Sequence, residues 1–99
     1  PKIFRFHGHA KAHEIGSPEF DALSGHFEEL TGARSIIVVD LFRIGDSCGY
    51  SVPLYDYKSD RDGLVKWAVN KGESGIKDYQ YEKNRKSLDG MPGMKNMEN

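Results

Sequence analysis

Several common features are scarce or missing in this chain of 99 residues, and each absence excludes a class of protein. A single cysteine, Cys48, cannot form an internal disulfide, which favours a reducing compartment such as the cytoplasm. The longest apolar run is far too short to cross a bilayer, so no membrane role is expected. The first residues lack the continuous apolar core of a signal peptide. Lys and Arg number 14 against 15 Asp and Glu, and the net charge of −1 lacks the basic excess of a nucleic-acid binder.

Motifs for binding phosphate or metal ions are also missing or weak. No Gly-rich phosphate loop of the P-loop or dinucleotide type is present. Three histidines (His7, His9 and His13) alternate along a predicted strand and share one face. Arg5 and Lys11 lie on that same face and repel a cation, and no carboxylate accompanies the histidines. A solvated strand face is therefore the preferred interpretation, with a metal site as the alternative.

Two other candidate sites also have a simpler structural interpretation. Cys48 needs a base or a helix N-terminus to become a nucleophile, and His26 is the one histidine outside the first strand. A small turn residue is the simpler role for Cys48. The basic run at residues 83–86 can bind phosphate, but such a run more often forms the wet face of a helix.

Two segments carry strong strand patterns. Residues 2–13 alternate, with one small and apolar face made by Phe4, Phe6, Gly8, Ala10 and Ala12. Residues 34–44 are apolar almost throughout, which is typical of a central strand covered on both faces. Residues 52–57 predict a short third strand, which Pro53 confines to a sheet edge or a strand start.

Helices are predicted between and after these strands. Ser17 and Pro18 form a good helix start, and a stripe at helical spacing extends to Gly32 through Phe20, Leu23, Phe27 and Leu30. Ser59 or Asp60 caps a second helix that Gly72 ends, with three side chains facing inward (Leu64, Trp67 and Ala68). A third helix starts at Ser74, and residues 87–93 predict turns.

The sequence predicts a single domain, residues 1–99. The two or three predicted strands are too few for a sheet that is stable by itself. The apolar strand at residues 34–44 requires neighbours on both edges. Either strands are missing from this chain, or the chain pairs with another copy or a partner.

Four segments together resemble the C-terminal half of pyridoxamine 5′-phosphate oxidase-like proteins, a family within the FMN-binding split barrels. In order along the chain they are residues 1–10 (PKIFRFHGHA), 32–35 (GARS), 47–53 (SCGYSVP) and 82–93 (EKNRKSLDGMPG). Their order and spacing follow the family over nearly the whole chain. The Ser-Cys-Gly-Tyr and Asp-Gly-Met-Pro-Gly motifs are the most specific of these, because they are typical of one subgroup of the family.

This resemblance implies a mainly β fold with flanking helices. The chain would be part of an antiparallel Greek-key split barrel and would lack the N-terminal strands. The resemblance also implies a homodimer that holds FMN in clefts at the subunit interface and acts on a small-molecule substrate. It places the turn formed by Ser47, Cys48, Gly49 and Tyr50 near the flavin or the dimer seam.

Two qualifications limit the function that the resemblance implies. The Arg-Leu-x-Pro segment that contacts substrate in the vitamin B6 oxidases is absent, so that activity is not expected and the substrate is unassigned. Most FMN phosphate ligands of the family lie upstream of the part seen here. The alternative hypothesis is a non-catalytic, truncated split barrel that dimerises or binds a partner through open strand edges.

Overall fold

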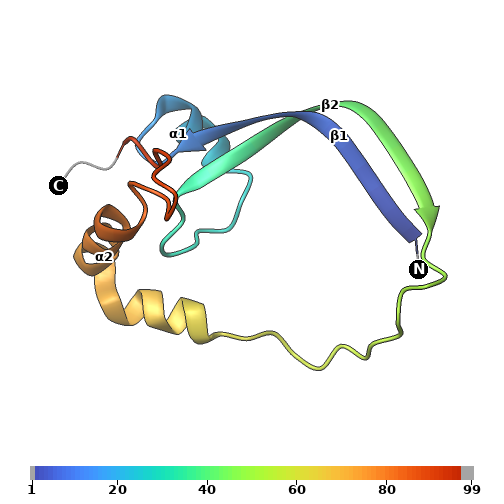
Figure 1. The fold of residues 1–99 in the computed structure, drawn as a ribbon. Helices are drawn as coiled ribbons and strands as arrows, with labels where there is room; N and C mark the ends of the chain where they lie inside the picture. The colour runs from blue at the N-terminus through green and yellow to red at the C-terminus, as the bar shows by residue number, and fades with distance from the viewer. Residues whose placement is uncertain (1, 97–99) are drawn as a thin grey trace.

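A long antiparallel hairpin dominates the computed structural model, which describes residues 2–96 (Figure 1). Strand β1 covers Lys2–Glu14, and strand β2 covers Ser35–Cys48. Both strong strand predictions are confirmed, and β2 continues past Ile44. The predicted antiparallel sheet with flanking helices is therefore present, but it has two strands and does not close into a barrel.

The hairpin contains a β-bulge near its middle, where its ribbon curves (Figure 1). His7 pairs with Arg43 and Gly8 pairs with Leu41, so Phe42 is the extra residue on β2. The two strands approach closely beside this bulge. A Cβ atom added at Gly8 would lie 2.5 Å from the carbonyl oxygen of Asp40. Only glycine fits this position without a backbone shift.

Helix α1, Pro18–Ser24, starts as predicted but ends early. The Ser17 hydroxyl caps it by accepting a hydrogen bond from the Phe20 amide at 3.2 Å. The helix was predicted to extend to Gly32, yet it stops at Gly25. Glycine lowers helix stability, and the last two apolar residues of the stripe, Phe27 and Leu30, are exposed. Without packing against that stripe, the second half of the helix gains too little to form.

Helix α2, Gly63–Lys83, is two helical segments joined by a kink at Gly72. Gly72 has φ 70° and ψ 172°, a conformation that favours glycine, so the predicted boundary between a second and a third helix is confirmed. The N-cap is Asp62 rather than Ser59 or Asp60. Asp62 makes no side-chain cap hydrogen bond and forms an ion pair with Lys66 instead.

Three side chains bridge the kink in α2. The Trp67 and Tyr79 rings meet edge to face, with centroids 4.9 Å apart. The Lys71 ammonium lies over both rings, 5.3 Å and 5.5 Å from their centroids. These cation–π contacts join the two segments across the kink.

An extended segment, residues 49–62 and here called the strap, connects the far end of β2 to α2 (Figure 1). The strand predicted at residues 52–57 is absent from it. Its large side chains are strongly exposed: Tyr50 94%, Leu54 91%, Tyr55 86% and Tyr57 79%. A connection of this length without regular structure is uncommon in a compact domain.

The described residues bury very little apolar surface. The buried apolar side chains are Ala68 and Ile76, both on α2. Of the three side chains predicted to face inward, Ala68 is buried, whereas Leu64 and Trp67 are exposed, so the prediction is wrong for these two. The radius of gyration is 17.4 Å, against about 13 Å for a compact domain of this length. The hairpin is therefore a single layer whose faces are open. In residues 2–96, no helix combines the length and apolar character that a membrane crossing requires.

A side chain at Gly8 is expected to destabilise the hairpin. Gly8→Ala should lower the free energy of unfolding by about 1–3 kcal/mol, because the strands must separate to admit the methyl group. Gly45→Ala on the same hairpin is the matched control, since a Cβ there meets no atom within 4 Å. Denaturant unfolding followed by circular dichroism compares the two variants. Equal stability would contradict the close approach of the strands at Gly8.

Candidate functional site

The predicted cofactor-binding residues lie together at the far end of the hairpin. Ser47 pairs with Ile3 and Cys48 pairs with Lys2, so both end strand β2. Gly49 is buried, and its carbonyl accepts a hydrogen bond from the Val52 amide at 3.0 Å, which closes a turn. Tyr50 extends into solvent. The segment is thus a tight turn in which Cys48 and Tyr50 are both exposed.

Covalent catalysis by Cys48 with His26 as its base finds no support. Cys48 pairs with Lys2 at the first residue of β1. His26 follows helix α1, which comes after the last residue of β1, Glu14. The two side chains therefore lie at opposite ends of the hairpin, too far apart for proton transfer.

The hairpin has one apolar face. Paired residues on neighbouring strands share a face, and Phe6 opposite Ile44 and Ala10 opposite Val39 illustrate the pattern. Six large side chains on this face are exposed: Phe4, Phe6, Ile37, Val39, Leu41 and Ile44. Gly8, Ala10 and Ala12 leave the face shallow along β1. A flat aromatic ring or another strand fits such a surface.

The opposite face of the hairpin is basic. It carries Arg5, Lys11 and Arg43, with one carboxylate (Asp40) opposite His9. The His9 and Phe42 ring centroids lie 5.3 Å apart, which places both residues on this face. None of the four salt bridges in the described residues involves these three cations. No group of three or more His, Cys, Asp or Glu side chains within the described residues is arranged to hold a metal ion.

A second ordered feature is the turn at residues 86–93, which the sequence predicted. Lys86 and Pro92 form an isolated β-bridge around it. The Ser87 amide donates to the Met91 carbonyl at 2.9 Å, and the Ser87 hydroxyl accepts from the Met91 amide at 2.9 Å. The same hydroxyl donates to the Asp89 carboxylate. This network joins Ser87, Asp89 and Met91 within the SLDGMPG segment.

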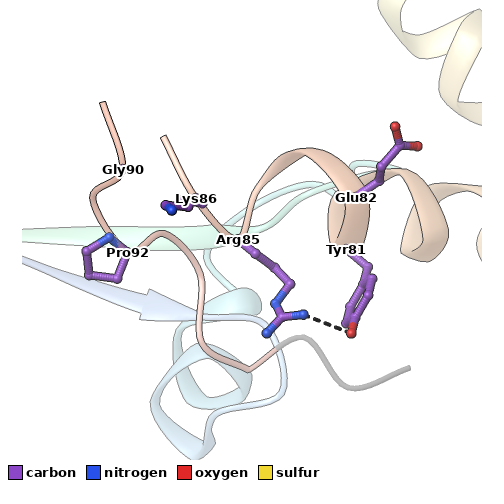
Figure 2. A pocket seen from close by; sticks show the side chains of 6 residues that line it. All are labelled: Tyr81, Glu82, Arg85, Lys86, Gly90 and Pro92. Atoms are coloured by element: carbon purple, nitrogen blue, oxygen red, sulfur yellow. Dashed lines mark hydrogen bonds between the residues drawn. The ribbon is translucent and has the colours of Figure 1, made fainter. Parts of the chain in front are cut away.

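Figure 2 shows a pocket of about 630 Å³ between this turn and the end of α2, lined by Tyr81, Glu82, Arg85, Lys86, Gly90 and Pro92. Arg85 stacks on the Tyr81 ring at 4.7 Å and donates to its hydroxyl at 2.8 Å. Lys83 pairs with Glu82, and Asn84 accepts a hydrogen bond from Arg34 at 3.0 Å. Lys83 and Arg85 of the basic run are thus engaged within the chain. The run was predicted to form the wet face of a helix, but α2 ends at Lys83, so this prediction is wrong for residues 84–86, which follow the helix.

The Ser87 hydrogen bond also affects the ionisation of the Asp89 carboxyl group. It lowers the pKa of Asp89, with the backbone as a smaller cause in the same direction. A carboxylate whose pKa is lowered in the folded state stabilises that state above its ordinary pKa. The contribution is lost as the pH falls through the lowered value. The turn is therefore most stable at neutral pH and loosens in acid.

Comparison with known proteins finds one related sequence. The chain is 38% identical to the pyridoxamine 5′-phosphate oxidase family protein ustO of Aspergillus flavus, over an alignment of 82 residues that covers 68% of this chain. The alignment covers 32% of that relative, so the chain spans about a third of its length. No protein-family model and no solved structure matches the chain. The family resemblance carried by the four sequence segments is confirmed.

Removing the Ser87 hydroxyl should loosen the turn. In Ser87→Ala, hydrogen exchange at the Met91 amide should rise about fivefold, because a net hydrogen bond is worth roughly 1 kcal/mol. In the parent chain the same exchange, corrected for its intrinsic pH dependence, should rise as the pH falls through the lowered pKa of Asp89 and the carboxylate becomes protonated. Ser59→Ala in the strap serves as control. Unchanged protection of Met91 in Ser87→Ala would contradict the network.

Proposed function

The chain is homologous to part of a pyridoxamine 5′-phosphate oxidase family protein, and from this relationship we propose that the whole protein is an FMN-binding oxidoreductase-like protein. Its substrate is a small molecule of unassigned identity. The sequence match to the relative carries the proposal, because neither the strand pattern nor the pockets would single out a flavin. A single cysteine fits the reducing cytoplasm as its compartment.

The residues of this chain fit the flavin ring. A flavin requires a flat and mostly apolar slot, and the apolar face of the hairpin supplies one wall of such a slot. At the end of this face the turn adds the Cys48 thiol, a backbone free of side chain at Gly49, and an exposed phenol ring at Tyr50 able to stack on an aromatic cofactor. Cys48, Gly49 and Tyr50 are the residues we propose to lie against the ring. Ser47 pairs with Ile3 and lies on the other face of the sheet.

The same residues do not fit the FMN phosphate. The nearest cation at the turn is Lys2, and it already forms an ion pair with Asp46 at 3.7 Å. The remaining cations of the hairpin lie on the basic face, opposite the apolar wall. The phosphate must therefore bind to residues outside this turn. This division predicts that the chain contacts the ring and that the remainder of the protein holds the phosphate.

When bound, the flavin would accept and donate the electrons of the reaction. The protein residues orient the ring and exclude water from one of its faces. Tyr50 would cover the ring edge, and it is not proposed to form a covalent bond with substrate.

We also propose that the hairpin belongs to a closed antiparallel split barrel in the whole protein, which assembles as a homodimer. A single-layer hairpin with an open apolar face is an incomplete unit, and additional strands would give it the second layer that a core requires. The alternative hypothesis of a non-catalytic module is not favoured, because the relative is named for an oxidase family.

The chain by itself should bind flavins weakly, and the phosphate group of FMN should add nothing to the affinity. Titration followed by flavin fluorescence should give similar affinities for riboflavin and FMN, because this chain offers no phosphate ligand at the turn. A longer form that includes the remaining strands should prefer FMN. No flavin binding by either form would overturn the proposed function.

Tyr50→Ala should weaken flavin binding by the longer form about fivefold, since an aromatic contact is worth about 1 kcal/mol. Phe27→Ala is the matched control, an exposed aromatic residue at the other end of the hairpin. Equal flavin affinities of the two variants would show that Tyr50 does not contact the flavin. Such a result would not affect the family relationship.

A further inference from the structure

The chain contains two Asp–Gly steps, Asp62–Gly63 and Asp89–Gly90, and no Asn–Gly step. Such a step can rearrange without an enzyme, because glycine has no side chain to hinder the attack of its amide nitrogen on the preceding side chain. The second step lies in the turn at residues 86–93, where Asp89 and Gly90 are both exposed. Gly90 has φ 87°, a conformation that favours glycine. The turn therefore brings a reactive pair of residues into contact with water.

The rearrangement of such a step passes through a cyclic imide. The Gly90 amide nitrogen would form a bond to Cγ of Asp89, and the carboxyl hydroxyl would leave as water with the amide proton. Water would then open the ring at either carbonyl carbon, which returns aspartate or gives isoaspartate. The overall change is an isomerisation, so it consumes no oxidant or other co-reactant. It requires a free amide nitrogen and a protonated carboxyl group, because a carboxylate is a poor electrophile.

Ser87 engages both of the reacting groups. Its hydroxyl donates to the Asp89 carboxylate, and this hydrogen bond favours the charged, unreactive form. Its carbonyl accepts from the Gly90 amide at 3.0 Å, which holds the attacking nitrogen. The Met91 amide donates to the same hydroxyl at 2.9 Å and so fixes its orientation. These bonds all lie within residues 87–91, so they do not depend on what else packs against the turn.

The other Asp–Gly step has no such arrangement. Asp62 makes no side-chain cap hydrogen bond, and its carboxylate pairs with Lys66, one turn further along α2. Among the backbone hydrogen bonds that residues 2–96 make outside helices and strands, none is donated by the Gly63 amide. The two steps share their chemistry and differ in their hydrogen bonds. Asp62 is therefore an internal reference for Asp89.

We propose that Asp89–Gly90 is a site of spontaneous isoaspartate formation and that the Ser87 hydroxyl determines its rate. The step is slow while the hydroxyl is bonded to the carboxylate, and it is faster once that bond is lost. Isoaspartate would lengthen the main chain by one carbon atom, because the chain would then run through the side chain. The added atom would displace Gly90 and Pro92, which line the pocket in Figure 2. This inference does not rest on the proposed function.

Incubation at neutral pH of the longer form that includes the remaining strands tests the proposal. Samples taken over time are digested, and the peptides that contain Asp62 and Asp89 are separated and fragmented in a mass spectrometer to identify isoaspartate. In Ser87→Ala, isoaspartate at Asp89 should form about fivefold faster than in the parent protein, the factor that corresponds to one net hydrogen bond. The rate at Asp62 should be the same in both proteins.

Ser87→Thr is the matched control, because it keeps the hydroxyl and should isomerise at Asp89 as slowly as the parent protein. The parent protein in urea gives the rate at Asp89 without the turn, and this rate should exceed that of the folded protein. Equal rates at Asp89 in the folded parent protein and in Ser87→Ala overturn the proposal. An equal rise at Asp62 and Asp89 in Ser87→Ala also overturns it, because the effect would then be a general loosening. No flavin is present, so neither result bears on the proposed function.

Discussion

The close pairing of β1 with β2 is the constraint on which the rest of the structure depends. Near Gly8 the strands approach so closely that no side chain fits, and beside this point the bulge at Phe42 bends the hairpin. This pairing places the Ser47–Tyr50 turn at one end and helix α1 at the other. It also sorts side chains into an apolar face and a basic face. A different register would mix the two faces and remove both surfaces.

The separation of these two faces determines which chemistry each end of the molecule can support. The apolar face provides area, and Lys2 on this face is paired with Asp46 at its end. The other Lys and Arg residues of the hairpin lie on the opposite side of the sheet. Four hydrogen bonds of Ser87 order the turn at residues 86–93, and two neighbouring cations, Lys83 and Arg85, are already engaged within the chain. The turn at residues 86–93 uses its hydrogen bonds within its own loop. The apolar face of the hairpin, in contrast, has no second layer packed against it.

Much of this arrangement could be predicted from local sequence. The alternation of residues 2–13, the apolar run after Arg34, the Ser17 cap and the break at Gly72 each depend on neighbouring residues, and each prediction was confirmed. The predictions that were wrong concern segments whose structure depends on residues far away in the sequence. The predicted helix to Gly32 and the predicted strand at residues 52–57 both needed a surface to pack against, which this chain does not supply. The Phe42 bulge also escaped prediction, because it arises from the register between two strands. The role of the Ser47–Tyr50 turn stays a prediction.

The kink in α2 has a different kind of consequence. The Lys71 ammonium lies over Trp67 before the kink and over Tyr79 after it, so one of the contacts between the two segments depends on a charge. Ala68 and Ile76 are buried on either side of the same kink, and Gln80 donates to the Gly32 carbonyl. These contacts do not depend on charge. The two segments of α2 are therefore joined by contacts of two kinds, and a change in salt or pH would weaken only one of them.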